Sequence, residues 1–387
     1  MKFVLRVVSV LAATAGFIQF APQAHSEVWL HATNVAYGSF SAVGSSADGH
    51  ILIATGSRGT FTSWDCGVTW RTNSFPGSAA SISATGSNII VGASSPEAIH
   101  TSADAGLTWT TQTNNPTFGP FNNVRMIVTS ADGLRLGLIL YGNCPIFTSA
   151  DAGVTWTTNN NSPVAYWTGI ASSTDGTRLA AIGQSGTGVW ISTNSGLAWS
   201  SAATFTAMSI ASSADGSKLL AAGSNKIYLS SDSGVTWTAQ DIQNMDGPAV
   251  ASSADGTRLA ATCYFGVYLS TNSGLTWTSA NVPALAWNAV AASADGHRWI
   301  ADSGAGSGLY IGSSQPTPEL QITATNAGAL LSWTIPSSPF ALQGRSDLNS
   351  GNWSVVEGDP KLNVNTLHKE LVIPATNSCS YFRLASP

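Results

Sequence analysis

Three acidic residues, Glu97, Asp246 and Asp302, are the side chains of this sequence whose type and position could carry out hydrolysis. A glycoside hydrolase needs two carboxyl groups flanking the scissile bond, one that donates a proton and one that acts as base or nucleophile. We predict Asp246 and Asp302 as that pair, with Glu97 as a third acid. Both members of the pair lie close to glycines, Gly247 and Gly304, so a structural role in turns is the alternative interpretation.

The same acids could instead hold a calcium ion, which prefers carboxylate and amide oxygens as ligands. Asn143 or Asn225 would add amide oxygens to such a site. A bound Ca²⁺ polarises a carbonyl oxygen, so a calcium-assisted lactonase is a second hydrolytic hypothesis. This hypothesis rests on analogy between folds, and we assign no metal ligands and no cofactor.

Aromatic residues beside small polar groups form a second set of candidates, for ligand binding. The set comprises Trp167, Trp287 and Phe40, which share one position at the start of a strand, the loop residues Tyr166, Tyr141 and Tyr264, and the arginines Arg58 and Arg125. Aromatic rings can stack on the C–H groups of a sugar while Asn and Ser bind its hydroxyls, which predicts a site for a neutral carbohydrate. Packing of these rings inside the protein is the alternative.

The composition narrows the classes of partner. The chain has 387 residues, of which only 9% are charged, with 15 Lys+Arg against 20 Asp+Glu. No basic stripe is present to neutralise phosphates, so we predict that the protein does not bind nucleic acid. A hydrophobic content of 43% and 14 Trp are enough to fill a large core and argue against disorder.

An internal repeat organises most of the chain. A turn of the type Ser-Ala-Asp-Gly recurs with its aspartate at Asp48, Asp132, Asp175, Asp215, Asp255 and Asp295, and Thr85 takes that place in one degenerate copy. The spacings are 37, 47, 43, 40, 40 and 40 residues, which makes seven units. Each unit contains four short apolar strands separated by turns, the length and rhythm of a β-propeller blade.

A second turn in each unit carries a family resemblance. Residues 63–70 match Ser-x-Asp-x-Gly-x-Thr-Trp, as do 102–109, 149–156 and 230–237; the copies at 192–199 and 270–277 have Asn194 and Asn272 in place of Asp, and the former also has Ala198 in place of Thr. These segments resemble the Asp-box (BNR) repeats of sialidase-like, sortilin-like and Ycf48-like propellers. The resemblance covers about residues 28–314 and implies an all-β, seven-bladed β-propeller.

The resemblance also implies where a functional site lies. In Asp-box families the box is structural and joins the third and fourth strands on the face away from the active site, so we expect function on the opposite face. Sialidase activity requires three central arginines. Four of the seven propeller arginines occupy one repeat position on the remote face, namely Arg135, Arg178, Arg258 and Arg298. We therefore predict that the protein is not a sialidase.

The remaining segments complete the predicted domain organisation. Residues 1–26 have the charged start, apolar stretch and small-residue cleavage site of a secretory signal. The seventh unit lacks the Thr-Trp strand, and we predict that the N-terminal strand after Glu27 supplies it and closes the ring. Residues 315–318 form a linker, and 319–387 resemble a C-terminal immunoglobulin- or fibronectin-III-like module, a small β-sandwich.

The cysteines fit a secreted protein without defining a disulfide. Cys66, Cys144, Cys263 and Cys379 match no zinc-binding spacing, and an oxidising compartment permits three full pairings as well as free thiols. We predict cleavage near Ser26 and an extracellular or periplasmic, monomeric protein with no transmembrane segment.

We predict that the protein is a secreted Asp-box propeller. It would bind a neutral ligand, either a glycan or an extracellular protein partner, on the face opposite the Asp-boxes. The alternative is a secreted hydrolase, either a Ca²⁺-assisted lactonase or a glycoside hydrolase that uses the loop carboxylates. The sequence does not decide whether the protein is an enzyme.

Overall fold

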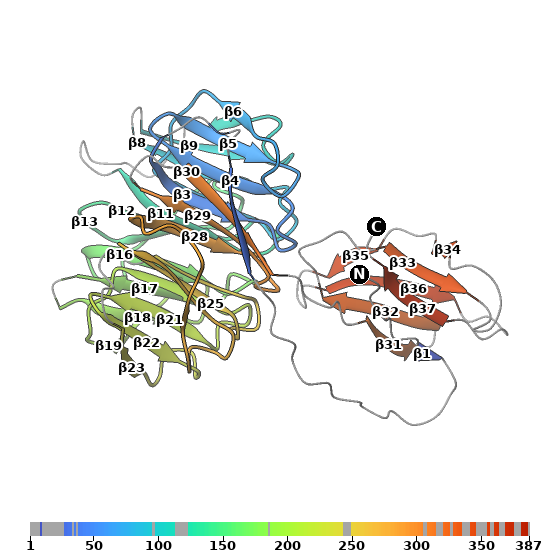
Figure 1. Cartoon of the computed structure of the whole chain (residues 1–387). Helices are drawn as coiled ribbons and strands as arrows, with labels where there is room; N and C mark the ends of the chain where they lie inside the picture. The colour runs from blue at the N-terminus through green and yellow to red at the C-terminus, as the bar shows by residue number, and fades with distance from the viewer. Residues whose placement is uncertain are drawn as a thin grey trace. The chain divides into compact units, whose positions relative to one another are not determined.

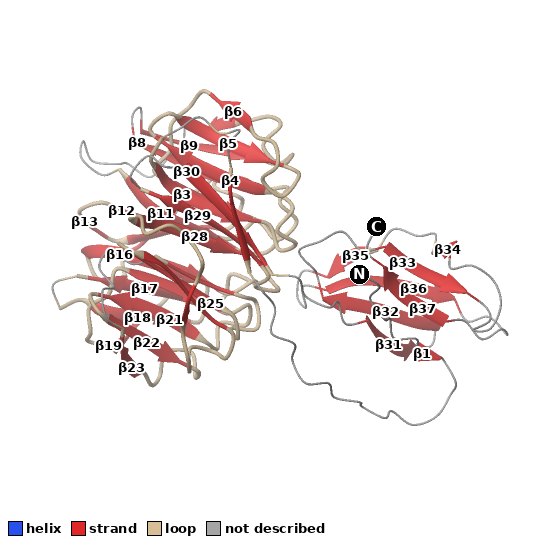
Figure 2. Ribbon diagram, viewed as in Figure 1, coloured by secondary structure: helices blue, strands red, loops and turns tan. Residues whose placement is uncertain are grey.

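The computed structural model describes most of the chain, which divides into two compact units, Glu27–Ser313 and Met1–Ser26 with Ser314–Pro387 (Figure 1). The described residues are 8–9, 27–32, 35, 38–94, 97–112, 123–184, 186–242, 249–304, 308–314, 320–325, 328–334, 341–345, 354–356, 360–363, 368–374 and 381–385. Their regular elements are all β-strands (Figure 2). Among these residues, no helix is long and apolar enough to cross a membrane.

Residues Glu27–Ser313 form a seven-bladed β-propeller, as the repeat predicted. Blades 1 to 3 are β3 (Phe40–Ser45), β4 (Leu52–Gly56), β5 (Gly59–Ser63) and β6 (Arg71–Asn73); β7 (Ala79–Ile82), β8 (Ile89–Ser94), β9 (Glu97–Ser102) and β10 (Thr110–Gln112); and β11 (Val124–Thr129), β12 (Leu136–Leu140), β14 (Ile146–Ser149) and β15 (Thr157–Asn159). Blade 4 is β16 (Ala165–Ser172), β17 (Leu179–Gly183), β18 (Gly188–Ser192) and β19 (Ser200–Ala203), with β13 (Asn143–Cys144) added at its inner edge.

The remaining blades follow the same antiparallel order. Blades 5 and 6 are β20 (Ser209–Ser212), β21 (Leu219–Gly223), β22 (Lys226–Ser230) and β23 (Thr238–Asp241); and β24 (Val250–Ser252), β25 (Leu259–Cys263), β26 (Gly266–Ser270) and β27 (Thr278–Ser279). Blade 7 is β28 (Trp287–Ala292), β29 (Arg298–Ser303), β30 (Gly308–Ser313) and β2 (Val28–His31). The prediction that an N-terminal strand closes the ring is confirmed, since Val28 pairs with Ser313 and His31 with Tyr310.

The core lies between the blades, which explains why the second strands are mostly apolar. All five residues of β4, β12, β17, β21 and β25 are buried. One face of each blade packs against the preceding blade and the other against the following blade, so alternation of polar and apolar residues is lost in the second strands. The first strands contact one another in sequence around a closed ring, from β3 through β28 and back to β3.

A ring of seven backbone hydrogen bonds joins the turns between the first and second strands. The bonds join the residues that precede the turn aspartates, or Thr85. The N–H of each such residue donates to the carbonyl oxygen of the equivalent residue in the next blade, in the order Ala47, Ala84, Ala131, Thr174, Ala214, Ala254, Ala294 and again Ala47. The N···O distances run from 2.6 to 2.9 Å. Only a small side chain fits where seven turns meet, which explains the alanine or threonine at this position. We call these segments the Asp-Gly turns.

The turns between the third and fourth strands, which we call the Trp turns, share one pattern of closing bonds, although Ala198 of blade 4 has no hydroxyl to contribute. In blade 2, Ser102 Oγ donates to Asp104 Oδ1 at 2.8 Å, and the amide N–H and hydroxyl of Thr108 donate to the same carboxylate at 2.8 and 2.6 Å. The N–H of Ala105 then donates to the carbonyl oxygen of Ser87, beside the Asp-Gly turn. This backbone bond to the Asp-Gly turn occurs in all six copies, so both sets of turns lie on one face, the turn face. The loop face is the opposite one.

The second unit holds two four-stranded sheets. One is β31 (Leu320–Thr325), β32 (Gly328–Thr334), β36 (His368–Pro374) and β35 (Lys361–Asn363), and the other is β1 (Val8–Ser9), β37 (Tyr381–Ala385), β33 (Ala341–Arg345) and β34 (Ser354–Val355). Leu331 and Trp333 of β32 share a hydrophobic cluster with Leu342 of β33, so the two sheets have a common core. The immunoglobulin-like assignment stays a prediction. Except for Val8–Ser9, the predicted signal and the linker 315–318 lie outside the described residues.

The closing strand provides a test of how the ring is held. Trp29 of β2 packs edge-on to Trp287 at a centroid distance of 6.5 Å. Trp29→Ala should lower the free energy of unfolding by about 2–3 kcal/mol, because it leaves a cavity beside a large aromatic residue. Urea unfolding would measure the change. Leu30→Ala on the same strand is the control: Leu30 is exposed and should cost less than about 0.5 kcal/mol. Equal costs for the two variants would contradict this account of the closure.

Candidate functional site

The three aromatic residues that share one strand position are buried. Trp167 and Trp287 are 1% exposed and Phe40 is 3% exposed. Trp167 Nε1 donates to the carbonyl oxygen of Cys144 at 3.0 Å, and Phe40 packs edge-on to Phe61 with ring centroids 5.5 Å apart. None of the three rings has a face open to a ligand. Their role is therefore packing inside the protein, the alternative set out above, and they cannot stack on a sugar.

The loop-face tyrosines of blades 3 and 4 are exposed and lie close together. Tyr141 and Tyr166 are each about half exposed, and β13 brings Asn143 opposite Tyr166 in the sheet. The guanidinium carbon of Arg125 lies 4.9 Å from the centroid of the Tyr141 ring, a cation–π contact. Arg125 Nε also donates to the carbonyl oxygen of Thr168 at 3.2 Å. We call Tyr141, Asn143, Tyr166 and Arg125 the tyrosine surface.

The other predicted ligand-binding residues are exposed on other blades. Tyr264 and its neighbour Phe265 lie in the loop between β25 and β26 of blade 6. Arg58 lies in the hairpin between β4 and β5 of blade 1, with its side-chain carbons against Gly38. The structure therefore assembles only part of the predicted aromatic set, on blades 3 and 4. The strand β13 that assembles it gave no repeat signal in the sequence.

The predicted catalytic acids are not seen as a pair. Asp246 lies outside the described residues, and Glu97 begins β9 with a side chain that is also outside the description. Asp302 is fully buried in β29, and neither of its carboxylate oxygens has a hydrogen-bond partner. Asp302 therefore cannot reach a substrate in this conformation.

Burial changes the acidity of Asp302. It raises the pKa of the carboxyl group from 3.8 to about 7, while the nearby backbone N–H of Phe40 opposes the rise. The position lies seven residues after the turn aspartate, where blades 1 and 6 have Thr55 and Thr262. Blade 7 thus holds a carboxyl group at the contact with blade 1 where other blades have smaller or apolar groups, and near neutral pH this group is partly protonated.

The described residues contain neither a cluster of side chains that would support the calcium hypothesis nor a disulfide. Among the described residues, no group of three His, Cys, Asp or Glu side chains could hold a metal ion. Cys66, Cys144 and Cys263 are free thiols, and Cys379 lies outside the described residues. Calcium binding stays a hypothesis.

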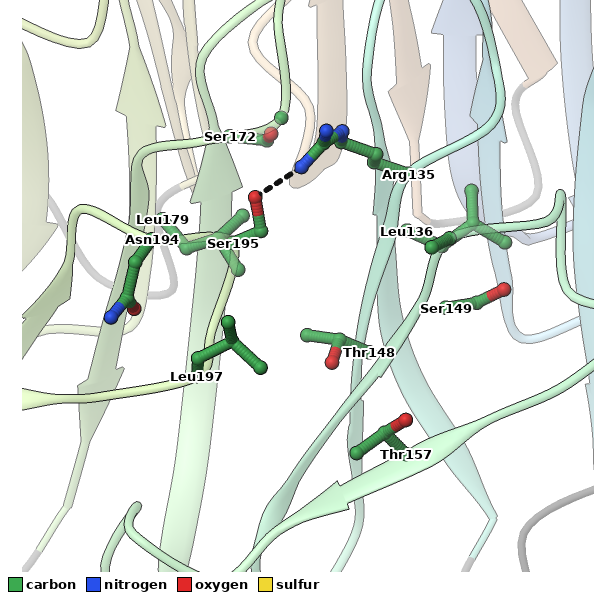
Figure 3. Close-up of a pocket in the computed structure, with 12 residues that line it drawn as sticks. Arg135, Leu136, Thr148, Ser149, Thr157, Ser172, Leu179, Asn194, Ser195 and Leu197 are labelled. Carbon is green, nitrogen blue, oxygen red and sulfur yellow. Dashed lines mark hydrogen bonds between the residues drawn. The ribbon is translucent and has the colours of Figure 1, made fainter.

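A cleft on the turn face between blades 3 and 4 was not anticipated from the sequence (Figure 3). Its volume is about 230 Å³, and Arg135, Leu136, Thr148 and Leu197 are among the residues that line it. The equivalent cleft between blades 4 and 5 is only about 10 Å³ and is lined by Ile191, which takes the place of Thr148 in the repeat. A shorter side chain accounts for the space. Small-molecule sites usually measure about 300–1,000 Å³, so we treat this cleft as a consequence of packing.

The burial of Asp302 predicts how the free energy of unfolding depends on pH. Because the pKa of Asp302 is higher in the folded protein, the folded state holds a proton that the unfolded state releases. Its contribution to stability is complete below about pH 4 and is lost as the pH rises through about 7. Asp302→Thr should therefore raise the free energy of unfolding at pH 8 by about 2–4 kcal/mol, and by much less at pH 4.

Urea unfolding of both proteins across pH 4–8 would measure this difference. Asp241→Asn is the matched control, because Asp241 is exposed and pairs with Lys226 at 3.5 Å. It should leave the pH profile unchanged within about 0.5 kcal/mol. A wild-type profile that Asp302→Thr does not flatten would show that the carboxyl group is hydrated in solution.

Solved structures share the fold at low sequence identity. A Ycf48 bound to D1 peptide has 13% identity and a TM-score of 0.57, over 77% of this chain and 99% of the other. A Ycf48 from Cyanidioschyzon merolae has 12% identity and a TM-score of 0.56, over 74% and 98%. The GH74 xyloglucanase from Xanthomonas campestris has 13% identity and a TM-score of 0.56, over 80% and 59%.

The family is established by sequence. No curated protein matches the chain, whereas the family model described as the DUF6242 beta propeller domain matches residues 23–263, well over half of it. The chain belongs to the DUF6242 β-propeller family.

Proposed function

We propose that the propeller is a binding module that recognises a segment of a protein partner on its loop face, through the tyrosine surface. The observation that carries the proposal is the exposure of Tyr141 and Tyr166 on either side of the β13–β16 pairing, with Arg125 against Tyr141. Tyrosine and arginine are the residues most enriched in the centres of protein interfaces.

The surface is suited to a neutral ligand with polar backbone groups. Arg125 is held by Tyr141 and by the Thr168 carbonyl oxygen, so its side chain is ordered before a ligand arrives. The Asn143 amide offers donors and an acceptor for a peptide group. The Ycf48 structure bound to D1 peptide, which shares the fold, supports a peptide as the ligand.

Export of the protein and binding of an extracellular partner belong to the same proposal, supported by the signal-like residues 1–26. A glycan on the loop face would use the same tyrosines. It would need a ring face to be open, however, and the Tyr141 ring is already in contact with Arg125. We therefore give priority to a peptide.

A hydrolase is the second candidate function, and one observation favours it. A carboxyl group with a pKa near 7 is what a general acid requires at neutral pH, and Asp302 is such a group. Asp302 would first have to be exposed, because it is fully buried. Glycoside or lactone turnover that persists in Asp302→Thr would remove Asp302 from consideration.

Selection of peptides from a displayed random library against the full chain tests the proposed function. We expect enriched peptides whose Kd rises at least about tenfold in Tyr141→Ala/Tyr166→Ala, because each truncation at an interface centre costs about 1–2 kcal/mol. Fluorescence anisotropy would measure the Kd. Tyr264→Ala on blade 6 is the matched control and should change it by less than about twofold.

A glycan array run in parallel identifies the other outcome. Glycan binding that the double variant removes, with no enriched peptide, would replace the peptide by a sugar. Peptides that bind the double variant as tightly as the wild type would place the site elsewhere.

A further inference from the structure

The turn face carries an exposed aliphatic residue in every Trp turn. These residues are Val68, Leu107, Val154, Leu197, Val235 and Leu275, one from each of blades 1 to 6, with 48–77% of their surface exposed. All six occupy the position between the turn glycine and the Thr-Trp pair, or the Ala-Trp pair in blade 4. Single exposed aliphatic residues are normal on a protein surface, but six at one repeat position are a pattern.

The geometry of the turn does not require an aliphatic residue there. The residue contributes its backbone N–H, as when Leu107 donates to the carbonyl oxygen of Asp104, and its side chain points into solvent. The residues at the other free positions of the turn differ from copy to copy. The position after the aspartate, for instance, is Cys66, Ala105, Ala152 or Ser195. Only the solvent-facing position remains restricted to Val or Leu.

Blades 1 to 3 are consecutive blades that each add a carboxylate to the exposed aliphatic residue, whereas the remaining turn carboxylate, Asp232 of blade 5, lies between the uncharged turns of blades 4 and 6. Asp65, Asp104 and Asp151 belong to the same turns as Val68, Leu107 and Val154. Hydrogen bonds from the following threonine and the preceding serine lower the pKa of each aspartate, although slight burial opposes the effect at Asp65 and Asp151. All three are therefore ionised at neutral pH. We call the three aspartates, together with Val68, Leu107 and Val154, the acidic arc.

Cations from the preceding blade reach the Trp turns of blades 1, 4, 5 and 6, but not those of blades 2 and 3. Three residues after the turn aspartate, blades 3 to 7 have Arg135, Arg178, Lys218, Arg258 and Arg298, whereas blades 1 and 2 have Ile51 and Asn88. Each such side chain crosses to the next blade, so Arg135 of blade 3 donates to Ser195 of blade 4. The turns of blades 2 and 3 therefore receive no cation, and Arg71 and Arg298 are the basic residues at blade 1.

From this chemistry, we propose that the acidic arc is a docking surface for a basic amphipathic segment of a partner protein, with apolar side chains against Val68, Leu107 and Val154 and Lys or Arg beside the three carboxylates. The Trp turns of blades 1 and 2 adjoin, since Trp64 Nε1 in blade 1 donates to the Ala105 carbonyl oxygen in blade 2 at 2.9 Å, and Gly153 in the turn of blade 3 lies beside Thr101 of blade 2. One extended segment can therefore follow them. This site is on the face opposite the tyrosine surface and does not depend on it.

A membrane is the less suitable occupant. Inserting the three aliphatic residues would bring three ionised carboxylates to the headgroup region. There they would lose hydration and be repelled by anionic lipids. A basic peptide instead gains both the apolar contact and the charge complementarity.

The copies of the Trp turn show which substitutions remove the charge or the apolar contacts of the acidic arc without opening the turn. Asn272 occupies the aspartate position in blade 6 and keeps the turn closed, since its Oδ1 accepts from Thr276 N at 2.9 Å and its Nδ2 donates to Thr276 Oγ1 at 2.8 Å. Asp65→Asn/Asp104→Asn/Asp151→Asn should therefore remove the charge alone. Val68→Ser/Leu107→Ser/Val154→Ser removes the apolar contacts, and Leu197→Ser/Leu275→Ser does the same at the two uncharged turns.

The probe is a fluorescein-labelled synthetic peptide in which lysine alternates with leucine, measured by anisotropy against the full chain. We expect both triple variants to raise its Kd at least about tenfold, while Leu197→Ser/Leu275→Ser changes it by less than about twofold. A matched peptide with glutamate in place of lysine should not bind. Thermal unfolding of each variant verifies that the propeller is intact.

Three results would overturn the proposal. The first is an equal loss of affinity in Leu197→Ser/Leu275→Ser, which would show non-specific binding around the whole face. The second is unchanged affinity in either triple variant. The third is binding of phosphatidylcholine vesicles that the serine triple variant abolishes, without binding of the lysine–leucine peptide, which would assign the arc to a lipid surface.

Discussion

The ring of seven backbone hydrogen bonds from Ala47 around to Ala294 and back is the constraint on which the propeller depends. Each bond joins the same residue of neighbouring blades at 2.6–2.9 Å, so a blade can be neither added nor lost without breaking the circle. The ring leaves room only for small side chains at the meeting point of the turns.

The ring separates the two faces chemically. On the turn face, hydrogen bonds within and between turns use most of the Ser, Thr and Asp side chains, so polar groups there serve first to close turns. On the loop face no repeated bond is required, and the connections differ in length and composition from blade to blade. Loops free of a structural requirement on a rigid scaffold are where recognition is usually found.

The fold could be predicted because its signals are local. An Asp-Gly pair at a spacing of about 40 residues marks a hairpin whatever surrounds it, and a seventh unit without its last strand needs one from elsewhere. The candidate site could not be predicted in the same way. That Tyr166 lies opposite Asn143 depends on β13, a segment more than 20 residues away in the chain. Asp302 stands in a loop-face position by its place in the repeat, yet blade 1 covers it.

The repeat itself separates what the fold demands from what it permits. Within a Trp turn, serine and aspartate accept or donate bonds, glycine adopts a positive φ of 84–88° in all six copies, and tryptophan donates to the glycine carbonyl. Each of these identities has a structural cause. The aliphatic residue after the glycine contributes only its backbone N–H to the turn, and 48–77% of its surface is exposed. No bond of the turn explains why this residue type recurs in six copies, and for an exposed aliphatic side chain we propose a contact with another molecule as the cause.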